Sequence, residues 1–157
     1  MDMYQSEKNL LEKLADAIPG LKGYRDKESR RDTDKRFREY LANRIDTSSD
    51  AIDDIKRRQV NEKKLDGLAD WDRLSQKLFK VSNSIRHATY GYSGFFDQVK
   101  IQEAELDRLY QYDLSLVADV EALEKSLQTT PQISDIESKV NALERRVEDR
   151  KNLFSAA

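Results

Sequence analysis

The chain has 157 residues, of which 37% are charged and 38% hydrophobic, and its 28 basic and 30 acidic side chains give a net charge of −2. A typical soluble domain has about 45–50% apolar and about 25% charged residues, so this composition disfavours a thick globular core and favours long, thin helices. The sequence has no cysteine, which excludes disulfides, thiolate catalysis and cysteine-ligated metal sites.

The N-terminal region does not have the basic-then-apolar order of a signal peptide, because Asp2, Glu7 and Glu12 interrupt it. No apolar run in the sequence approaches the roughly 20 residues that cross a bilayer. We therefore expect a soluble, cytoplasmic protein with one domain over residues 1–157, from which the N-terminal segment 3–18 could be separable.

Residues 3–18 predict a short amphipathic helix, which Pro19 and Gly20 end because proline lacks a backbone N–H and restricts the preceding residue. The segment could pack as one more helix of the domain, dock in a groove of a partner, or lie in a membrane interface. Its four acids would be repelled by anionic lipid, so we favour the first reading. The candidate residues for a membrane or a partner's groove are Leu10, Leu11, Leu14 and Ile18.

Two apolar stripes follow, and they predict helices over residues 25–61 and 67–88. The first stripe contains Phe37, Leu41, Ile45, Ile52 and Ile55, and the second contains Leu68, Trp71, Leu74, Leu78, Val81 and Ile85. At about 100° per residue, Ile55 and Trp71 are roughly 160° out of register. This favours a break between residues 61 and 67, although one continuous helix with two differently directed faces is the alternative.

The segment 22–38 is rich in basic residues and has a net charge of about +4, since four acids dilute its eight basic side chains. On a helix, Lys27, Arg31, Lys35 and Arg38 lie near one face. This face could bind nucleic acid, meet the acidic segment 103–124 of the same or another molecule, or face water. The candidate residues are Arg31 and Lys35, and we consider nucleic acid an improbable partner.

The single histidine, His87, is predicted at a helix C-terminus, where the helix dipole favours it, rather than as a base or metal ligand. After it comes a segment with Gly91 and Gly94 that predicts a loop. This loop could plug one end of the helices or form a recognition surface. Its candidate interaction residues are Tyr90, Tyr92, Phe95 and Phe96.

The last third of the chain shows a seven-residue rhythm that predicts helices over 97–128 and 132–154. Apolar residues in each segment recur in alternating steps of three and four, which places them on one narrow stripe. The short break at 129–132 lets the two helices fold back as an antiparallel coiled-coil hairpin. Asp113 stands on the first stripe, and we expect it to pair with Arg146 or Arg150 of the second helix.

No phosphate loop, nucleophile elbow, zinc-protease helix or calcium loop occurs in the sequence. We therefore predict no enzyme activity, no catalytic residues, no cofactor and no metal site.

Residues 18–24, with the sequence IPGLKGY, resemble a family of small, uncharacterised bacterial helical proteins. Glu28, Arg30, Arg31 and Asp34 and the segment 90–96 add to the resemblance, which implies an all-helical fold and no known activity. In architecture, the chain is also similar to membrane-stress scaffolds of the phage-shock-protein A and ESCRT-III type.

The sequence thus predicts an all-α protein, an elongated antiparallel helical bundle with a coiled-coil hairpin and about five helices. The predicted function is a non-catalytic scaffold or adaptor that binds protein, with self-assembly as one form of that role. The alternatives are a peripheral membrane protein acting through residues 3–18 and, third, a nucleic-acid binder acting through residues 22–38.

Overall fold

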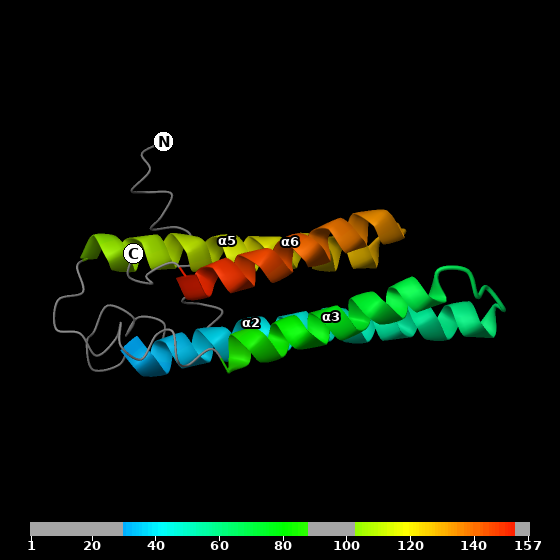
Figure 1. Ribbon diagram of the computed structural model, residues 1–157, viewed down its shortest axis with the longest axis horizontal. Coiled ribbons are helices and arrows are strands. Elements are labelled where there is room, and N and C mark those ends of the chain that lie inside the picture. The colour runs from blue at the N-terminus through cyan, green and yellow to red at the C-terminus, as the bar shows by residue number, and fades with distance from the viewer. Residues whose placement is uncertain (1–29, 88–102, 153–157) are drawn as a thin grey trace.

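The computed structural model describes residues 30–87 and 103–152. In these two ranges the structure is all-helical, with α2 (Arg30–Asn61), α3 (Leu68–Arg86), α5 (Glu103–Gln128) and α6 (Ile133–Asn152) (Figure 1). The prediction of about five helices exceeds these four, and the predicted helix over 3–18 lies outside the described residues. Residues 25–29 and 97–102 of two other predicted helices lie outside them as well.

The predicted break between residues 61 and 67 is confirmed, because α2 ends at Asn61 and α3 begins at Leu68. The turn between them uses the left-handed backbone region twice, at Lys63 with φ 59° and at Gly67 with φ 80°. The N–H of Trp71 donates to the Gly67 carbonyl at 3.0 Å and so closes the first turn of α3. A glycine suits this position, since the left-handed region costs other residues roughly 1–2 kcal/mol.

The predicted stripes of α5 and α6 are buried along most of the part of each helix whose side chains are described, and Ile133 at the start of the α6 stripe is half-buried. In α5 the buried positions are Asp113, Leu116, Val120, Leu123 and Leu127, and in α6 they are Ile136, Val140, Leu143, Val147 and Arg150. Thr129 to Gln132 separate the two helices. Steps of three and four therefore place these side chains on the inner face of each helix.

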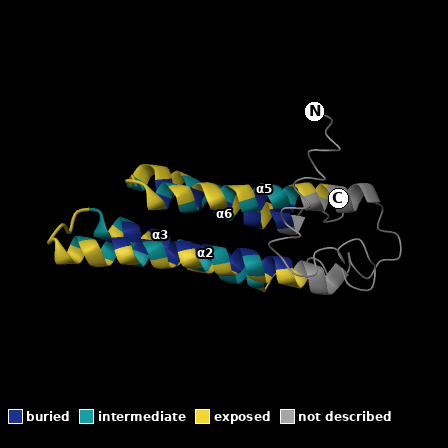
Figure 2. Ribbon diagram, turned by 180° about the vertical axis from the view of Figure 1, so that it is seen from behind, coloured by how far each residue is buried: buried dark blue, intermediate teal, exposed yellow. Residues whose placement is uncertain are grey.

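All four described helices surround one hydrophobic core. Helix α2 contacts α3 and α5, and α6 contacts α3 and α5. The α5–α6 pair lies along the α2–α3 pair, and the α2–α3 turn projects beyond the α5–α6 turn (Figure 1). Buried positions lie between the two pairs, while the projecting turn is exposed (Figure 2). The core therefore runs lengthwise between two antiparallel helix pairs.

Within the part of the chain that the structure describes, no helix combines the length and apolar character that crossing a membrane requires.

Candidate functional site

A buried ion pair joins α5 to α6. The guanidinium of Arg150 donates from Nε to Asp113 Oδ1 at 2.7 Å and from Nη2 to Oδ2 at 3.1 Å. Arg150 is 0% exposed and Asp113 is 1% exposed. The guanidinium also lies 5.5 Å from the ring centroid of Phe37 in α2, so it touches a third helix. The predicted pairing of Asp113 is confirmed for Arg150, and its surroundings make it part of the core.

The other predicted partner, Arg146, makes different contacts. Its Nη1 donates to Asp119 Oδ2 at 2.7 Å, and its guanidinium lies 5.2 Å from the ring centroid of Tyr112. The Tyr112 hydroxyl donates to the Arg146 carbonyl at 2.6 Å. Burial raises the pKa of Tyr112, and the positively charged side chain of Arg146 offsets only part of that rise. These side chains fix α5 against α6 and leave the tyrosine neutral.

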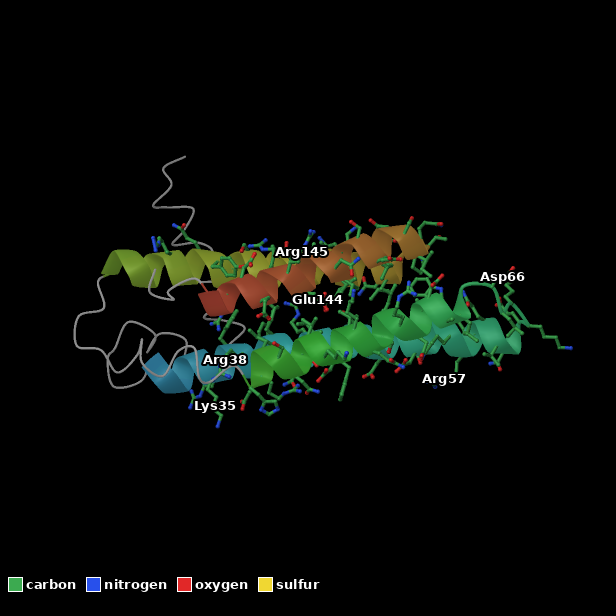
Figure 3. The ribbon with its side chains drawn as sticks, in the orientation of Figure 1. Lys35, Arg38, Arg57, Asp66, Glu144 and Arg145 are labelled. Atoms are coloured by element: carbon green, nitrogen blue, oxygen red, sulfur yellow. The ribbon has the colours of Figure 1, made fainter. Side chains whose placement is uncertain are left out.

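The basic face predicted for α2 is divided by the fold. Lys35 is exposed and projects from α2 (Figure 3). Arg38 is only 4% exposed, and its Nη1 donates to the Arg86 carbonyl at 2.7 Å. Arg38 therefore does not add to an exposed basic face beside Lys35, because its guanidinium binds the carbonyl end of α3. Arg31 lies within α2, but its side chain is outside the described residues.

Ion pairs do join α2 to the acidic segment of α5, but the basic residue that makes them lies outside the predicted basic segment. Arg44, which lies beyond the segment 22–38, pairs with Glu124 and lies 3.7 Å from Glu121 of α5. Its Nη1 also donates to the Tyr40 hydroxyl at 2.9 Å. This contact is internal to one molecule.

A second polar network crosses between α2 and α3. The Ser49 hydroxyl donates to the Ser75 carbonyl at 3.1 Å, and the Ser75 hydroxyl donates to Asp53 Oδ1 at 2.8 Å. The Lys56 ammonium lies 3.0 Å from Asp53 and 2.7 Å from Asp72 of α3. Two carboxylates and one ammonium are thus held in fixed positions by the two helices.

Hydrogen bonds within this network shift two pKa values. Burial acts to raise the pKa of Asp53, but the hydrogen bonds from Ser75 and Lys56, with the charges of Lys56 and Arg57, lower it overall. The pKa of Lys56 is raised mainly by its hydrogen bond to Asp72, against the opposing effect of burial. Both charged forms are therefore favoured in the folded protein.

We expect Asp53→Asn to lower the free energy of unfolding at pH 7 by about 0.2–1 kcal/mol, because exposed ion pairs are screened by water. The pKa of Asp53 is lower in the folded protein than its unfolded value of about 3.9. The stabilisation that ionised Asp53 adds to the free energy of unfolding is therefore fully present above about pH 3.9, and it is lost as the pH falls through the folded-state pKa. Urea unfolding of both proteins across this pH range measures the difference. A difference that does not shrink on acidification would contradict the assignment, and the exposed Asp54→Asn is the control.

The polar network lies on the face of the α2–α3 hairpin that is turned away from α5 and α6. Asp53 is nine residues from Arg44, which pairs with α5, and so points about 180° away around α2. Phe79 is two residues from Lys77, which donates to Asn141 of α6, and so points about 160° away around α3. We call the surface that carries Asp53, Asp72 and Phe79 the outer face.

An open groove of about 690 Å³ lies on the outer face next to the projecting turn, where Figure 3 labels Arg57 and Asp66. Val60, Leu68 and Ala69 provide its apolar lining. Val60 is 51% exposed, and Leu65 in the turn is 65% exposed. The groove is completed by the polar residues Asp53, Lys56, Arg57, Asn61 and Asp72.

The charged residues of the groove largely neutralise one another. Lys56 is paired with Asp53 and Asp72, and Arg57 lies 3.0 Å from Asp54. A charged small molecule would have to displace these internal partners, whereas an apolar side chain would not. The groove is therefore better suited to an apolar group than to a charged one.

A second groove, of about 400 Å³, runs between α3 and α6. Its lining residues include Val81 and Val147 and the charged residues Lys80, Glu144, Arg145 and Glu148. Both valines are almost fully buried. This groove therefore offers little apolar surface to a partner.

Most of the predicted interaction residues lie outside the described residues. These are Leu10, Leu11, Leu14 and Ile18 in the segment 3–18, and Tyr90, Tyr92, Phe95 and Phe96 in the segment 90–96. His87 follows α3 directly, is exposed, and its N–H donates to the Asn83 carbonyl at 3.0 Å, as its predicted place at a helix end requires. In residues 30–87 and 103–152, His, Asp and Glu side chains form no group of three suited to a metal ion.

Val60, Leu65 and Phe79 are not among the interaction residues that the sequence predicts. Val60 and Phe79 lie off the apolar stripes of their helices, which can be seen in the sequence. Single exposed apolar residues are common on protein surfaces, so this is only a weak indication of a binding site.

Comparison of the chain with protein-family models, with curated proteins and with solved structures found no match.

Proposed function

We propose that this protein is a non-catalytic scaffold or adaptor that binds protein through the outer face of its α2–α3 hairpin. The proposal includes an elongated bundle with coiled-coil packing of α5 on α6, and action in the cytoplasm. The observation that carries it is the apolar groove beside the projecting turn, with Val60 half exposed and its neighbouring charges paired internally.

The arrangement of the core supports this role. The buried ion pair of Asp113 and Arg150 and the contact of Arg38 with α3 fix the helices relative to one another. A preorganised surface loses less conformational freedom on binding than a mobile one. The outer face is therefore a rigid surface whose exposed apolar side chains are available to a partner.

The alternatives of membrane association through residues 3–18 and nucleic-acid binding through residues 22–38 stay predictions. Most of their candidate side chains lie outside the described residues, and no observation on α2 favours either role.

Photo-crosslinking from the groove tests the proposal. A photoreactive phenylalanine analogue replaces Val60 in the full-length chain, which is expressed in the cells that naturally produce it. Irradiation is expected to give a discrete protein adduct, whether with this chain or another, that mass spectrometry identifies. The same analogue at Ser138, an exposed residue of α6, is the matched control.

An adduct from position 60 that is absent from position 138 supports the proposal. Equal and diffuse labelling from both positions, or no protein adduct from position 60, contradicts it.

A further inference from the structure

We infer that the projecting end of the α2–α3 hairpin docks on an anionic lipid surface, with Leu65 among the lipid headgroups and basic side chains on their phosphates. We call this end, residues 57–66, the tip, and Figure 3 labels Arg57 and Asp66 in it. The inference goes beyond the proposed function, because Leu65 is not among the residues that line the groove of the outer face.

The apolar feature of the tip is Leu65. It is 65% exposed, more than the other exposed large hydrophobic residues of the described ranges, Val60 and Phe79. It neither belongs to the hydrophobic core nor packs against it. Single exposed apolar residues are common, so the leucine indicates a binding site only together with the charges around it.

The charges of the tip are mainly positive. The tip contains four basic and two acidic residues, whereas the whole chain has a net charge of −2. The basic residues are Arg57, Arg58, Lys63 and Lys64, and all four are exposed. Farther back along the hairpin, the carboxylates of Asp53 and Asp72 are paired with Lys56. The tip therefore presents an excess of positive charge beside an exposed leucine.

Two ion pairs at the tip do not remove this charge from use. Arg57 lies 3.0 Å from Asp54, and Lys64 lies 3.3 Å from Glu62. All four side chains are more than half exposed, so water and salt screen both pairs and a dense anionic surface competes with them.

Lys63 and Lys64 stand where a helix end usually has other residue types. Helix α2 ends in a Schellman motif, in which the Lys64 N–H donates to the Gln59 carbonyl at 2.8 Å and the Lys63 N–H to the Val60 carbonyl at 3.1 Å. Lys63 has φ 59°, where glycine is usual, and Lys64 follows where an apolar side chain usually packs back on the helix. The turn itself therefore requires neither lysine, which favours a role for them in binding.

The position and size of the tip favour lipid as the partner. The tip extends beyond the α5–α6 turn, so a flat surface can meet it without touching that turn (Figure 1). A stable protein interface buries about 800 Å² on each partner, which is large for so short a turn, whereas a fluid lipid surface adapts to one inserted side chain. Single-stranded nucleic acid would gain little, since its bases stack on aromatic side chains, which residues 57–66 lack.

Co-sedimentation of the full-length chain with vesicles tests the inference. The wild type is expected to bind vesicles of phosphatidylglycerol and phosphatidylcholine in equal parts, but not vesicles of phosphatidylcholine alone, and added salt is expected to release it. Lys63→Glu combined with Lys64→Glu is expected to lower the apparent affinity more than about tenfold. Lys125→Glu combined with Arg145→Glu makes the same charge change at exposed positions of α5 and α6, and a loss below about threefold is expected.

Two further variants separate binding from folding. Leu65→Ser removes the apolar group without changing the charge and is expected to lower the affinity about fivefold. Lys63→Gly removes one cation and suits the left-handed backbone, so its vesicle binding is expected to weaken while its urea midpoint stays the same or rises. A purely structural role of Lys63 would instead lower the urea midpoint and leave binding unchanged.

A fluorophore that is sensitive to its environment tests the contact itself, and the cysteine-free sequence allows it to be attached at one position. On Leu65→Cys, its emission is expected to move to shorter wavelength when phosphatidylglycerol vesicles are added. On Ser138→Cys, at an exposed position of α6, no shift is expected.

A wild-type chain that does not bind the anionic vesicles, or that binds phosphatidylcholine equally well, overturns the inference. So do tip variants that bind as tightly as the wild type, and so does a fluorophore that shifts equally at positions 65 and 138. Leu11→Asp combined with Leu14→Asp is expected to keep vesicle binding, and its loss in this variant alone would place the contact in the segment 3–18. Photo-crosslinking from position 60 is read independently of vesicles, so the inference can fail while the proposed function stands.

Discussion

Replacing Asp113 with alanine is expected to lower the free energy of unfolding by about 3–5 kcal/mol, because it removes one partner of a buried ion pair. The variant leaves the Arg150 guanidinium in a site where it is 0% exposed, without the carboxylate that accepts two of its hydrogen bonds. An uncompensated charge in the core is far more costly than a lost surface contact. Urea unfolding followed by circular dichroism measures the change.

A double variant separates the cost of an unpaired charge from the value of the ion pair. Asp113→Leu combined with Arg150→Met removes both charges and keeps apolar groups of similar size at both positions. We expect this protein to be much closer to the wild type than Asp113→Ala is, since buried pairs are often replaceable by apolar residues. A double variant as unstable as the single one would show that the pair itself, and not the orphaned charge, determines the loss.

Leu78→Ala is expected to lower the free energy of unfolding by about 2–5 kcal/mol, through lost apolar burial and the cavity that remains. Leu78 is 0% exposed and belongs to the core that the four described helices share. Its neighbour Phe79 provides a matched control, since Phe79→Ala removes a larger side chain from a position that is 57% exposed.

Phe79→Ala is expected to cost less than about 1 kcal/mol when both variants are unfolded at the same low protein concentration. Equal losses for Leu78→Ala and Phe79→Ala would contradict the burial pattern of α3.

Some contacts could be predicted because local spacing alone determines them. The alternating steps of three and four, with a short break at 129–132, set the depth at which α5 meets α6, and this brought Asp113 opposite Arg150. Likewise, Ile55 and Trp71 would point in nearly opposite directions on one straight helix, so they could not both face the same core. The break before Leu68 could therefore be predicted.

Other contacts depend on tertiary positions that spacing does not contain. Arg38 lies three residues from Lys35, and nothing in the sequence tells that the carbonyl end of α3 would lie beside one of them. Val60 and Phe79 are exposed because α5 and α6 cover the other side of the α2–α3 hairpin. Helical periodicity predicts which residues form the apolar stripe of a helix, but it does not predict which of the other faces a neighbouring helix covers. The outer face could therefore be recognised only from the structure.

The parallel arrangement of the two helix pairs has a practical consequence for immobilising or labelling the molecule. Arg30, Arg86, Glu103 and Asn152 lie at one end, opposite the α2–α3 turn. From Arg30 to Arg57 the axis of α2 extends about 40 Å. A surface anchor or fluorophore attached beside Asn152 would thus be placed far from Val60. Force applied between Arg30 and Asn152 would act at the end of the molecule where Arg150 of α6 meets Phe37 of α2, not through the distal hairpin.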